Sequence, residues 1–198
     1  MIKELILASQ SPRRKELLSL IVEEFKVVEG TFDESTVPNT LPPSQHVVYS
    51  AGMKASSVAS IHPDAVVIGA DTIVVLDDTI MGKPTDTDHA RSMLASLSGR
   101  THQVYTGLAL IADGVKISAF ECTDVVFTTL SHQMIDRYVS SGEPLDKAGA
   151  YGIQGIGCAL IEKVNGCYFN VVGLPVHRLA RLLAHFRVDT FLTRTNHD

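Results

Sequence analysis

Two carboxylates occupy positions from which they could act on a phosphate ester. Asp71 directly follows residues 65–70 (AVVIGA), a continuously apolar run that predicts a buried strand. A carboxylate at the end of such a strand is costly to desolvate unless a metal, a cation or a proton-transfer role stabilises it. Glu34, in a polar loop, can supply a second oxygen ligand, because Mg²⁺ is typically held by one or two carboxylates plus substrate phosphates. The alternatives are that Asp71 caps a turn and that Glu34 is merely solvated.

Residues 9–14 (SQSPRR) could form a phosphate cradle. They lie between a predicted strand and a helix start. Backbone N–H groups, the hydroxyls of Ser9 and Ser11 and the guanidiniums of Arg13 and Arg14 can therefore converge on one anion. The alternative is an ordinary helix cap followed by two solvated arginines. The chain contains no Walker A sequence, which argues against a P-loop enzyme.

Two lysines and a glutamine could contact other parts of the same ligand. Lys54 is the lone cation on a helix face of small apolar residues, and Lys83 lies in a rigid Gly-Lys-Pro turn. Either could neutralise a polyphosphate, and a solvated surface lysine is the alternative for each. The glycine-rich segment 149–155 (GAYGIQG) offers Gln154 a close approach to a flat ligand edge. His89, His102 and His177 share no metal-ligand spacing, so we interpret them as structural.

The elements that must position these residues follow an α/β pattern. Apolar residues with period two predict strands, and apolar residues at helical spacing predict helices. Polar caps, Ser11 and Ser44 among them, are expected to begin the helices. The predicted strands cover 4–8, 25–28, 65–70, 73–76, 101–112 and 115–130; hairpins are predicted at 77–78, 113–114 and 165–166; helices are predicted from 12, 44, 86, 131 and 175.

Composition places the chain among ordinary globular proteins. Its 198 residues are 45% hydrophobic and 20% charged, which allows a sizeable core. The 17 Lys and Arg against 22 Asp and Glu give a net charge of −5 without a basic block, which argues against nucleic acid as a partner. No apolar run reaches the length of a signal h-region or of a membrane span. We therefore expect a cytoplasmic protein without a membrane partner, with one domain over 1–187 and a polar tail over 188–198.

Four long motifs, taken in order, resemble the Maf family of nucleoside triphosphate pyrophosphatases. They are LILASQSPRRKELL, GADTIVVLDDTIMGKP, LSGRTHQVYTGLAL and SGEPLDKAGAYGIQGIGCALIEKVNGCYFNVVGLP. The resemblance runs from about Leu5 to Leu183. The last motif is similar to the branch that acts on dTTP and UTP, whereas the branch associated with 7-methyl-GTP carries a tryptophan where Arg13 stands here.

The resemblance implies a fold and a set of partners. The expected fold is α/β, with a mixed twisted sheet flanked by helices in an elongated, two-lobed single domain similar to inosine triphosphate pyrophosphatases. A Mg²⁺ or Mn²⁺ requirement and a homodimer are also implied. Met53 and Phe32 depart from the residues that the family often carries at those positions.

The resemblance also implies residue roles. Asp71 resembles the family's proton acceptor, and Glu34 together with Asp71 resembles its metal ligands. Lys54 and Lys83 resemble its phosphate-contacting lysines. The positions linked to base selection match Arg13, Thr72 and Gln154.

We therefore expect the chain to hydrolyse dTTP, UTP and modified pyrimidine triphosphates to the monophosphate and pyrophosphate. The expected role is sanitation of the nucleotide pool. In this hypothesis Asp71 takes the proton of a metal-bound water, and Lys54, Lys83 and Arg14 offset the charge on the leaving pyrophosphate. One alternative is a nucleotide-binding regulator of cell division that acts through a protein partner without turnover. Another is a nucleotidyl transferase.

Overall fold

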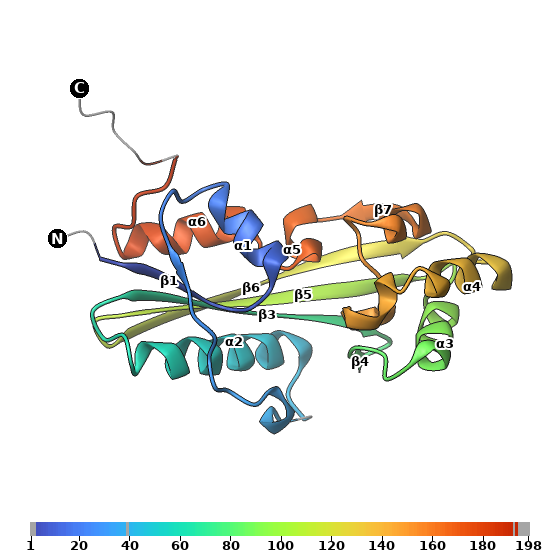
Figure 1. The fold of residues 1–198 in the computed structure, drawn as a ribbon, viewed down its shortest axis with the longest axis horizontal. Coiled ribbons are helices and arrows are strands. Elements are labelled where there is room, and N and C mark those ends of the chain that lie inside the picture. The colour runs from blue at the N-terminus through green and yellow to red at the C-terminus, as the bar shows by residue number, and fades with distance from the viewer. Residues whose placement is uncertain (1–2, 39, 192, 194–198) are drawn as a thin grey trace. The chain divides into compact units, whose positions relative to one another are not determined.

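A mixed β-sheet runs through the protein. The computed structural model describes residues 3–38, 40–191 and 193. The strands are β1 (Leu5–Ala8), β2 (Lys26–Val27), β3 (Val66–Leu76), β4 (Thr79–Met81), β5 (Thr101–Ala112), β6 (Val115–Phe127) and β7 (Ile161–Asn165). They form a seven-stranded sheet in the order β2-β1-β3-β5-β6-β7, with β4 paired to β3 (Figure 1). β1 is parallel to β2 and β3, whereas β4 is antiparallel to β3 and β7 is antiparallel to β6. The predicted α/β class with a mixed sheet flanked by helices is confirmed.

Helices connect most of the strands. They are α1 (Pro12–Ser19), α2 (Pro43–Ala59), α3 (Thr87–Leu97), α4 (His132–Ser140), α5 (Tyr168–Val172) and α6 (Val176–His185), with short 3₁₀ turns η1 (Glu34–Thr36), η2 (Glu143–Asp146), η3 (Ala148–Ala150) and η4 (Ile156–Leu160). Ser11, Asp86 and Ser131 cap α1, α3 and α4 with their side-chain oxygens, as predicted.

The chain forms two compact units. Unit 1 comprises the described residues up to Asp71, then Thr106–Glu121, then the described residues from Gly173 onward. Unit 2 comprises Thr72–Tyr105 and Cys122–Val172. The long strands β3, β5 and β6 contribute residues to both units.

In unit 1, helices cover both faces of the sheet. α2 lies on one face, and α1 and α6 lie on the other (Figure 1). All of β1 is buried, as its apolar sequence requires for a strand covered on both faces. On the α2 side, Ala51, Ala55 and Val58 pack against Ile6 and Val67. Small residues on α2 therefore allow the helix to lie close to the sheet.

In unit 2, α3 and α4 pack on strand residues to form a second core, which includes Leu94, Ile135 and Phe127. His102 is fully buried in this core, and its Nε2 lies 2.8 Å from the hydroxyl oxygen of Tyr151. Burial lowers the pKa of His102 to about 4, so the ring is neutral near pH 7. Its place in the core agrees with a structural role.

Three local predictions were wrong. β3 does not end at residue 70 but continues through Asp71 to Leu76. α2 begins at Pro43 behind Pro42, which gives no side-chain cap, so Ser44 lies inside the helix. No hairpin forms about Asn165-Gly166: β7 pairs with β6, and the chain then enters α5.

The C-terminal segment is described only in part. Thr190 is buried, and the Phe191 N–H donates to Ile21 O at 3.0 Å, so the segment is attached to unit 1 at this point. The rest of the predicted 188–198 tail, residues 192 and 194–198, lies outside the described residues. Within the described part of the chain, no helix has both the length and the apolar character needed to cross a bilayer.

Candidate active site

A lysine between two carboxylates forms the centre of the candidate site, which lies in unit 1. Lys54 Nζ is 2.7 Å from Glu34 Oε1 and 2.6 Å from Asp71 Oδ1. The side chains of Asp71 and Lys54 are 9% and 13% exposed, whereas that of Glu34 is 67% exposed. The three residues therefore form one charged group with a buried inner end and an outer end open to solvent.

A close approach of α2 to β3 brings Lys54 to Asp71. Alternate residues of a strand share a face, so Asp71 points to the same side of β3 as Gly69. A Cβ atom on Gly69 would overlap the carbonyl oxygen of Ala51 and lie 2.8 Å from the backbone nitrogen of Ala55. Only glycine therefore lets the helix lie this close, and Lys54 reaches from it to the carboxylate two residues beyond Gly69.

The Lys54 ammonium explains how Asp71 tolerates burial. From the sequence, a metal, a cation or a proton-transfer role was expected to stabilise this carboxylate, and the structure places a cation there. A buried ion pair adds little net stability compared with apolar packing. Removing one partner is nevertheless destabilising, because it leaves the other charge buried and unpaired. Such groups are frequent at functional sites, which makes this pair a candidate for chemistry.

Ser9, Ser11 and Arg14 form a second polar group at the start of α1. Ser9 Oγ accepts hydrogen bonds from the Ser11 N–H at 3.2 Å and from Arg14 Nη1 at 3.3 Å. Ser11 Oγ accepts from the Arg14 N–H at 3.4 Å, and Arg14 Nε donates to Gly173 O at 2.9 Å. The residues predicted to form a phosphate cradle are thus held together at a helix N-terminus, where anions are favoured.

Electrostatic interactions link this group to the carboxylates. Burial lowers the pKa of Arg14 below its ordinary value; the charges of Asp71 and Glu34 oppose the shift, and the charge of Arg13 adds to it. An arginine remains protonated despite such a shift. A bound anion would offset the cost of burying the guanidinium, so the group is suited to hold phosphate.

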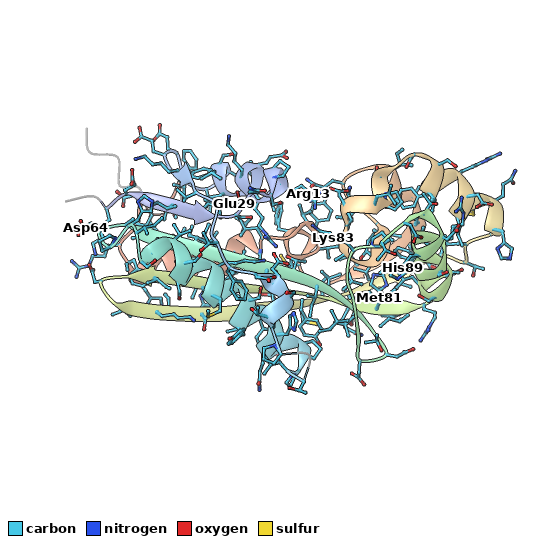
Figure 2. The ribbon with its side chains drawn as sticks, turned by 60° about the horizontal axis from the view of Figure 1, so that its bottom comes forward. Arg13, Glu29, Asp64, Met81, Lys83 and His89 are labelled. Atoms are coloured by element: carbon cyan, nitrogen blue, oxygen red, sulfur yellow. The ribbon has the colours of Figure 1, made fainter. Side chains whose placement is uncertain are left out.

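The structure brings seven of the predicted site residues together in unit 1: Ser9, Ser11, Arg13, Arg14, Glu34, Lys54 and Asp71. Arg13 is half-buried in the first turn of α1 (Figure 2). The other three predicted residues belong to unit 2. There Thr72 is half-buried, whereas Lys83, just after β4 (Figure 2), and Gln154, just before η4, are exposed. Their roles stay predictions.

The chemistry of the donor atoms fits a hard divalent cation. Among residues 3–38, 40–191 and 193, no three His, Cys, Asp or Glu side chains come together as a metal cage. Glu34 and Asp71 nevertheless place two carboxylate oxygens around one cation, the Lys54 ammonium. Mg²⁺ commonly takes one or two carboxylates and completes its shell with water and substrate phosphates. These residues therefore fit a cation that binds together with a phosphate ligand.

The carbonyl of Gly173 is a site contact that sequence reasoning missed. It accepts the hydrogen bond from Arg14 Nε although the two residues are 159 positions apart. Every residue carries a backbone carbonyl, so no residue type or spacing could have indicated this partner.

Fold and site together define a class of protein. An acidic pair, a lysine and an arginine gather beside a helix N-terminus on an α/β sheet, an arrangement suited to phosphate chemistry with a cation. Residues 4–186 match the family model described as Maf-like protein. The chain belongs to the Maf family, which confirms the resemblance of its four motifs.

Individual relatives are similar over almost their whole length. The chain is 47% identical over 188 residues to the dTTP/UTP pyrophosphatase of Bacillus pumilus (strain SAFR-032), which covers 95% of this chain and 99% of the relative. It is 48% identical over 187 residues to the dTTP/UTP pyrophosphatase of Bacillus cereus (strain B4264), covering 94% and 97%. The solved structure of the Staphylococcus aureus Ham1 protein aligns with a TM-score of 0.45 and 15% identity over 63% of this chain and 72% of that one, which is too weak a similarity to support a conclusion.

Proposed function

We propose that this chain hydrolyses dTTP and UTP to the nucleoside monophosphate and pyrophosphate with the help of a divalent cation. The observation that carries the proposal is the Lys54 ammonium held between Glu34 and Asp71, because it brings two carboxylates to one cation within electrostatic reach of Arg14. The names of the two relatives at 47% and 48% identity, both dTTP/UTP pyrophosphatases, support the substrate class.

Glu34 and Asp71 would hold the cation, because their carboxylate oxygens are the hard ligands that Mg²⁺ or Mn²⁺ prefers. When bound, such an ion would lower the pKa of a bound water and offset phosphate charge. Lys54, which pairs with both carboxylates, would then be available to contact a phosphate oxygen.

The side chains divide the remaining work. Asp71 accepts the proton of the attacking water, which strengthens the nucleophile during attack on the α-phosphorus. The N–H groups and hydroxyls at the start of α1, with Arg14, bind and orient the triphosphate. Lys54 and Lys83 offset the negative charge that develops on the departing pyrophosphate. This scheme needs no covalent intermediate.

Base selection is assigned to Arg13, Thr72 and Gln154 on the strength of the family resemblance. Uracil and thymine present the same edge, two carbonyl acceptors flanking the N3–H donor. The Gln154 amide can donate to one carbonyl and accept from N3–H. Cytosine presents an amino donor and an unprotonated N3 at those places, so both hydrogen bonds would be mismatched.

The setting of the activity forms part of the same proposal. We infer that a single catalytic domain over 1–187 works in the cytoplasm as a homodimer and removes unwanted, including modified, pyrimidine triphosphates. A net charge of −5 without a basic block supports a nucleotide rather than a nucleic acid as the ligand. The same composition gives no reason to expect a membrane partner.

A triphosphate panel tests the proposal. The purified chain is incubated with Mg²⁺ and dTTP, UTP, CTP or a purine triphosphate, and pyrophosphate and monophosphate are both quantified. We expect dTTP and UTP to be cleaved at comparable rates, with pyrophosphate as the product and with CTP and the purines poor. Tight binding without turnover would instead favour the regulatory alternative, and release of orthophosphate would exclude attack at the α-phosphorus.

A further inference from the structure

The loop that carries Gln154 donates hydrogen bonds to a half-buried carboxylate, that of Glu143. Residues 152–157, here called the Gln154 loop, wrap around the side chain of Glu143. Glu143 Oε2 accepts a hydrogen bond from the Ile156 N–H at 2.8 Å, and Oε1 accepts one from the Gly157 N–H at 3.0 Å. Oε1 also accepts from the Tyr138 hydroxyl at 2.9 Å, and that hydroxyl accepts from the Gly152 N–H at 3.0 Å. The loop is thus attached to these two side chains on both sides of Gln154.

The glycines of the loop make room for this attachment. A Cβ atom on Gly155 would overlap the Glu143 carboxylate, and one on Gly157 would lie 2.5 Å from the Tyr138 hydroxyl oxygen. The sequence alone suggested that the glycines of residues 149–155, Gly155 among them, let Gln154 approach a ligand. In the structure they let Glu143 and Tyr138 enter the loop.

The attachment is anchored in the core of unit 2. Tyr138 belongs to α4 and is 3% exposed, within the cluster that contains Ile135 and Val139. Burial raises the pKa of Glu143, but the N–H groups of Gly157 and Ile156, the Tyr138 hydroxyl and the charge of Lys147 outweigh it, so the pKa lies below its ordinary value. The carboxylate is therefore ionised at neutral pH, and hydrogen bonds to an ionised acceptor are stronger than neutral ones.

We propose that Glu143 and Tyr138 are positioning residues for base selection: they fix the Gln154 loop so that the exposed Gln154 amide is presented in one orientation. The proposal rests on the proposed function, in which Gln154 reads the edge of the base. Selection by hydrogen bonds requires donors and acceptors held in place before the ligand arrives, because a mobile amide can turn to suit cytosine as well as uracil. A fixed loop thereby converts a flexible glutamine into a selective one.

Amide exchange tests the positioning without any nucleotide. In Glu143→Gln, one of the two acceptor oxygens becomes an NH₂ group that cannot accept from the loop, and the charge is lost. We expect the Ile156 and Gly157 amides to exchange about tenfold faster than in the wild type. The matched control is Glu162→Gln, the same change on an exposed residue of β7, which should leave exchange in the loop unaltered. Unchanged exchange in Glu143→Gln would overturn the proposal.

Substrate selectivity separates positioning from general stability. For Glu143→Gln we expect the ratio of kcat/KM for UTP over CTP to fall about tenfold, because both the N–H contacts and the charge are affected. Ile135→Val, a mild core change in α4, should lower the Tm while the ratio persists. A fall in activity on UTP and CTP in equal proportion would assign Glu143 a structural role only.

The two proposals can fail separately. If the wild-type chain releases no pyrophosphate from any triphosphate, the proposed function fails while the exchange experiment still decides whether Glu143 fixes the loop. If the chain cleaves UTP and its ratio survives Glu143→Gln, positioning alone fails. Should Glu143→Gln not fold, as judged by circular dichroism, Tyr138→Phe supplies the same measurements with a smaller expected change.

Discussion

The charged group of unit 1 and the Gln154 loop of unit 2 are built in opposite ways. In unit 1, Asp71 stands on β3, Lys54 on α2 and Arg14 in α1, and Glu34, on the 3₁₀ turn η1, completes the charged group from outside. In unit 2 Gln154 stands on an irregular segment between 3₁₀ turns. The packing of α2 on β3 brings Lys54 to Asp71. The Gln154 loop is instead held by hydrogen bonds from its N–H groups to the Glu143 carboxylate.

The difference indicates how the two tasks place different demands on the chain. Proton transfer and phosphate binding need charges at fixed positions, which strands and helices supply. Reading the edge of a base needs a side chain that projects from the surface, and a loop allows this projection. Glu143 gives that loop a fixed geometry by binding its N–H groups. On this view the charged group of unit 1 serves turnover and the Gln154 loop of unit 2 contributes to the choice of base, and four substitutions test this comparison.

Asp71→Asn should have the largest effect, and this effect should be a loss of turnover. The amide keeps the shape of the carboxylate but cannot accept the proton of water, and loss of a general base typically lowers the rate by ~10²–10⁴-fold. Triphosphate binding, measured by calorimetry, should persist. Residual hydrolysis should retain the wild-type preference among pyrimidines, because Gln154 is untouched. Near-normal kcat would remove Asp71 from the mechanism.

Gln154→Ala should have the opposite effect: it should lower the selectivity among pyrimidines more than it lowers turnover. Leaving mismatched polar groups unpaired costs about 1–3 kcal/mol each, which corresponds to roughly ten- to several-hundredfold discrimination against CTP. Without the amide, the pyrimidine preference should flatten more than total activity falls. The measurement is kcat/KM for dTTP, UTP and CTP, made in parallel. Intact selectivity in Gln154→Ala would contradict the role of Gln154 in base selection.

Features that depend on neighbouring residues could be predicted from the sequence, whereas features that depend on distant contacts could not. The cap at Ser11 and the turn at Asp113-Gly114 depend on neighbouring residues, so both were predicted correctly. The continuation of β3 through Asp71 was not predicted, because aspartate disfavours strands and its stabilising partner Lys54 comes from another element.

A local turn signal also gave a wrong prediction where a contact with a distant residue determines the path of the chain. Asn165-Gly166 carries a hairpin signal, but Thr123 Oγ1 accepts from the Cys167 N–H at 3.1 Å and donates to the Cys167 carbonyl at 3.2 Å. The chain after β7 is therefore held beside β6 and proceeds into α5. Gln154 could be named from its motif, whereas Glu143 could not, because only the folded loop shows which N–H groups it binds.

Glu34→Gln should act on unit 1 more weakly than Asp71→Asn. One anionic oxygen ligand becomes neutral, so the Mg²⁺ concentration for half-maximal activity should rise, on the order of tenfold, while kcat at saturating metal changes less. The exposed Glu29→Gln is a matched control, because it removes the same charge from the loop that precedes Glu34. An unchanged metal titration in Glu34→Gln would leave Glu34 as a solvated partner of Lys54.

Tyr138→Phe should give the smallest change, and it should separate the contribution of the Tyr138 hydroxyl to the Gln154 loop from that of the Glu143 carboxylate. The ring stays in the core, but the hydroxyl that donates to Glu143 and accepts from the Gly152 N–H is removed. A neutral hydrogen bond contributes about 1 kcal/mol, so the Gly152 amide should exchange roughly fivefold faster, with the Tm little altered. Ile156 and Gly157 keep their carboxylate acceptor, so their exchange should change less than in Glu143→Gln. The UTP over CTP ratio should fall by a correspondingly smaller factor. If Tyr138→Phe instead loosened all three amides as much as Glu143→Gln does, the tyrosine rather than the carboxylate would be the residue that fixes the loop.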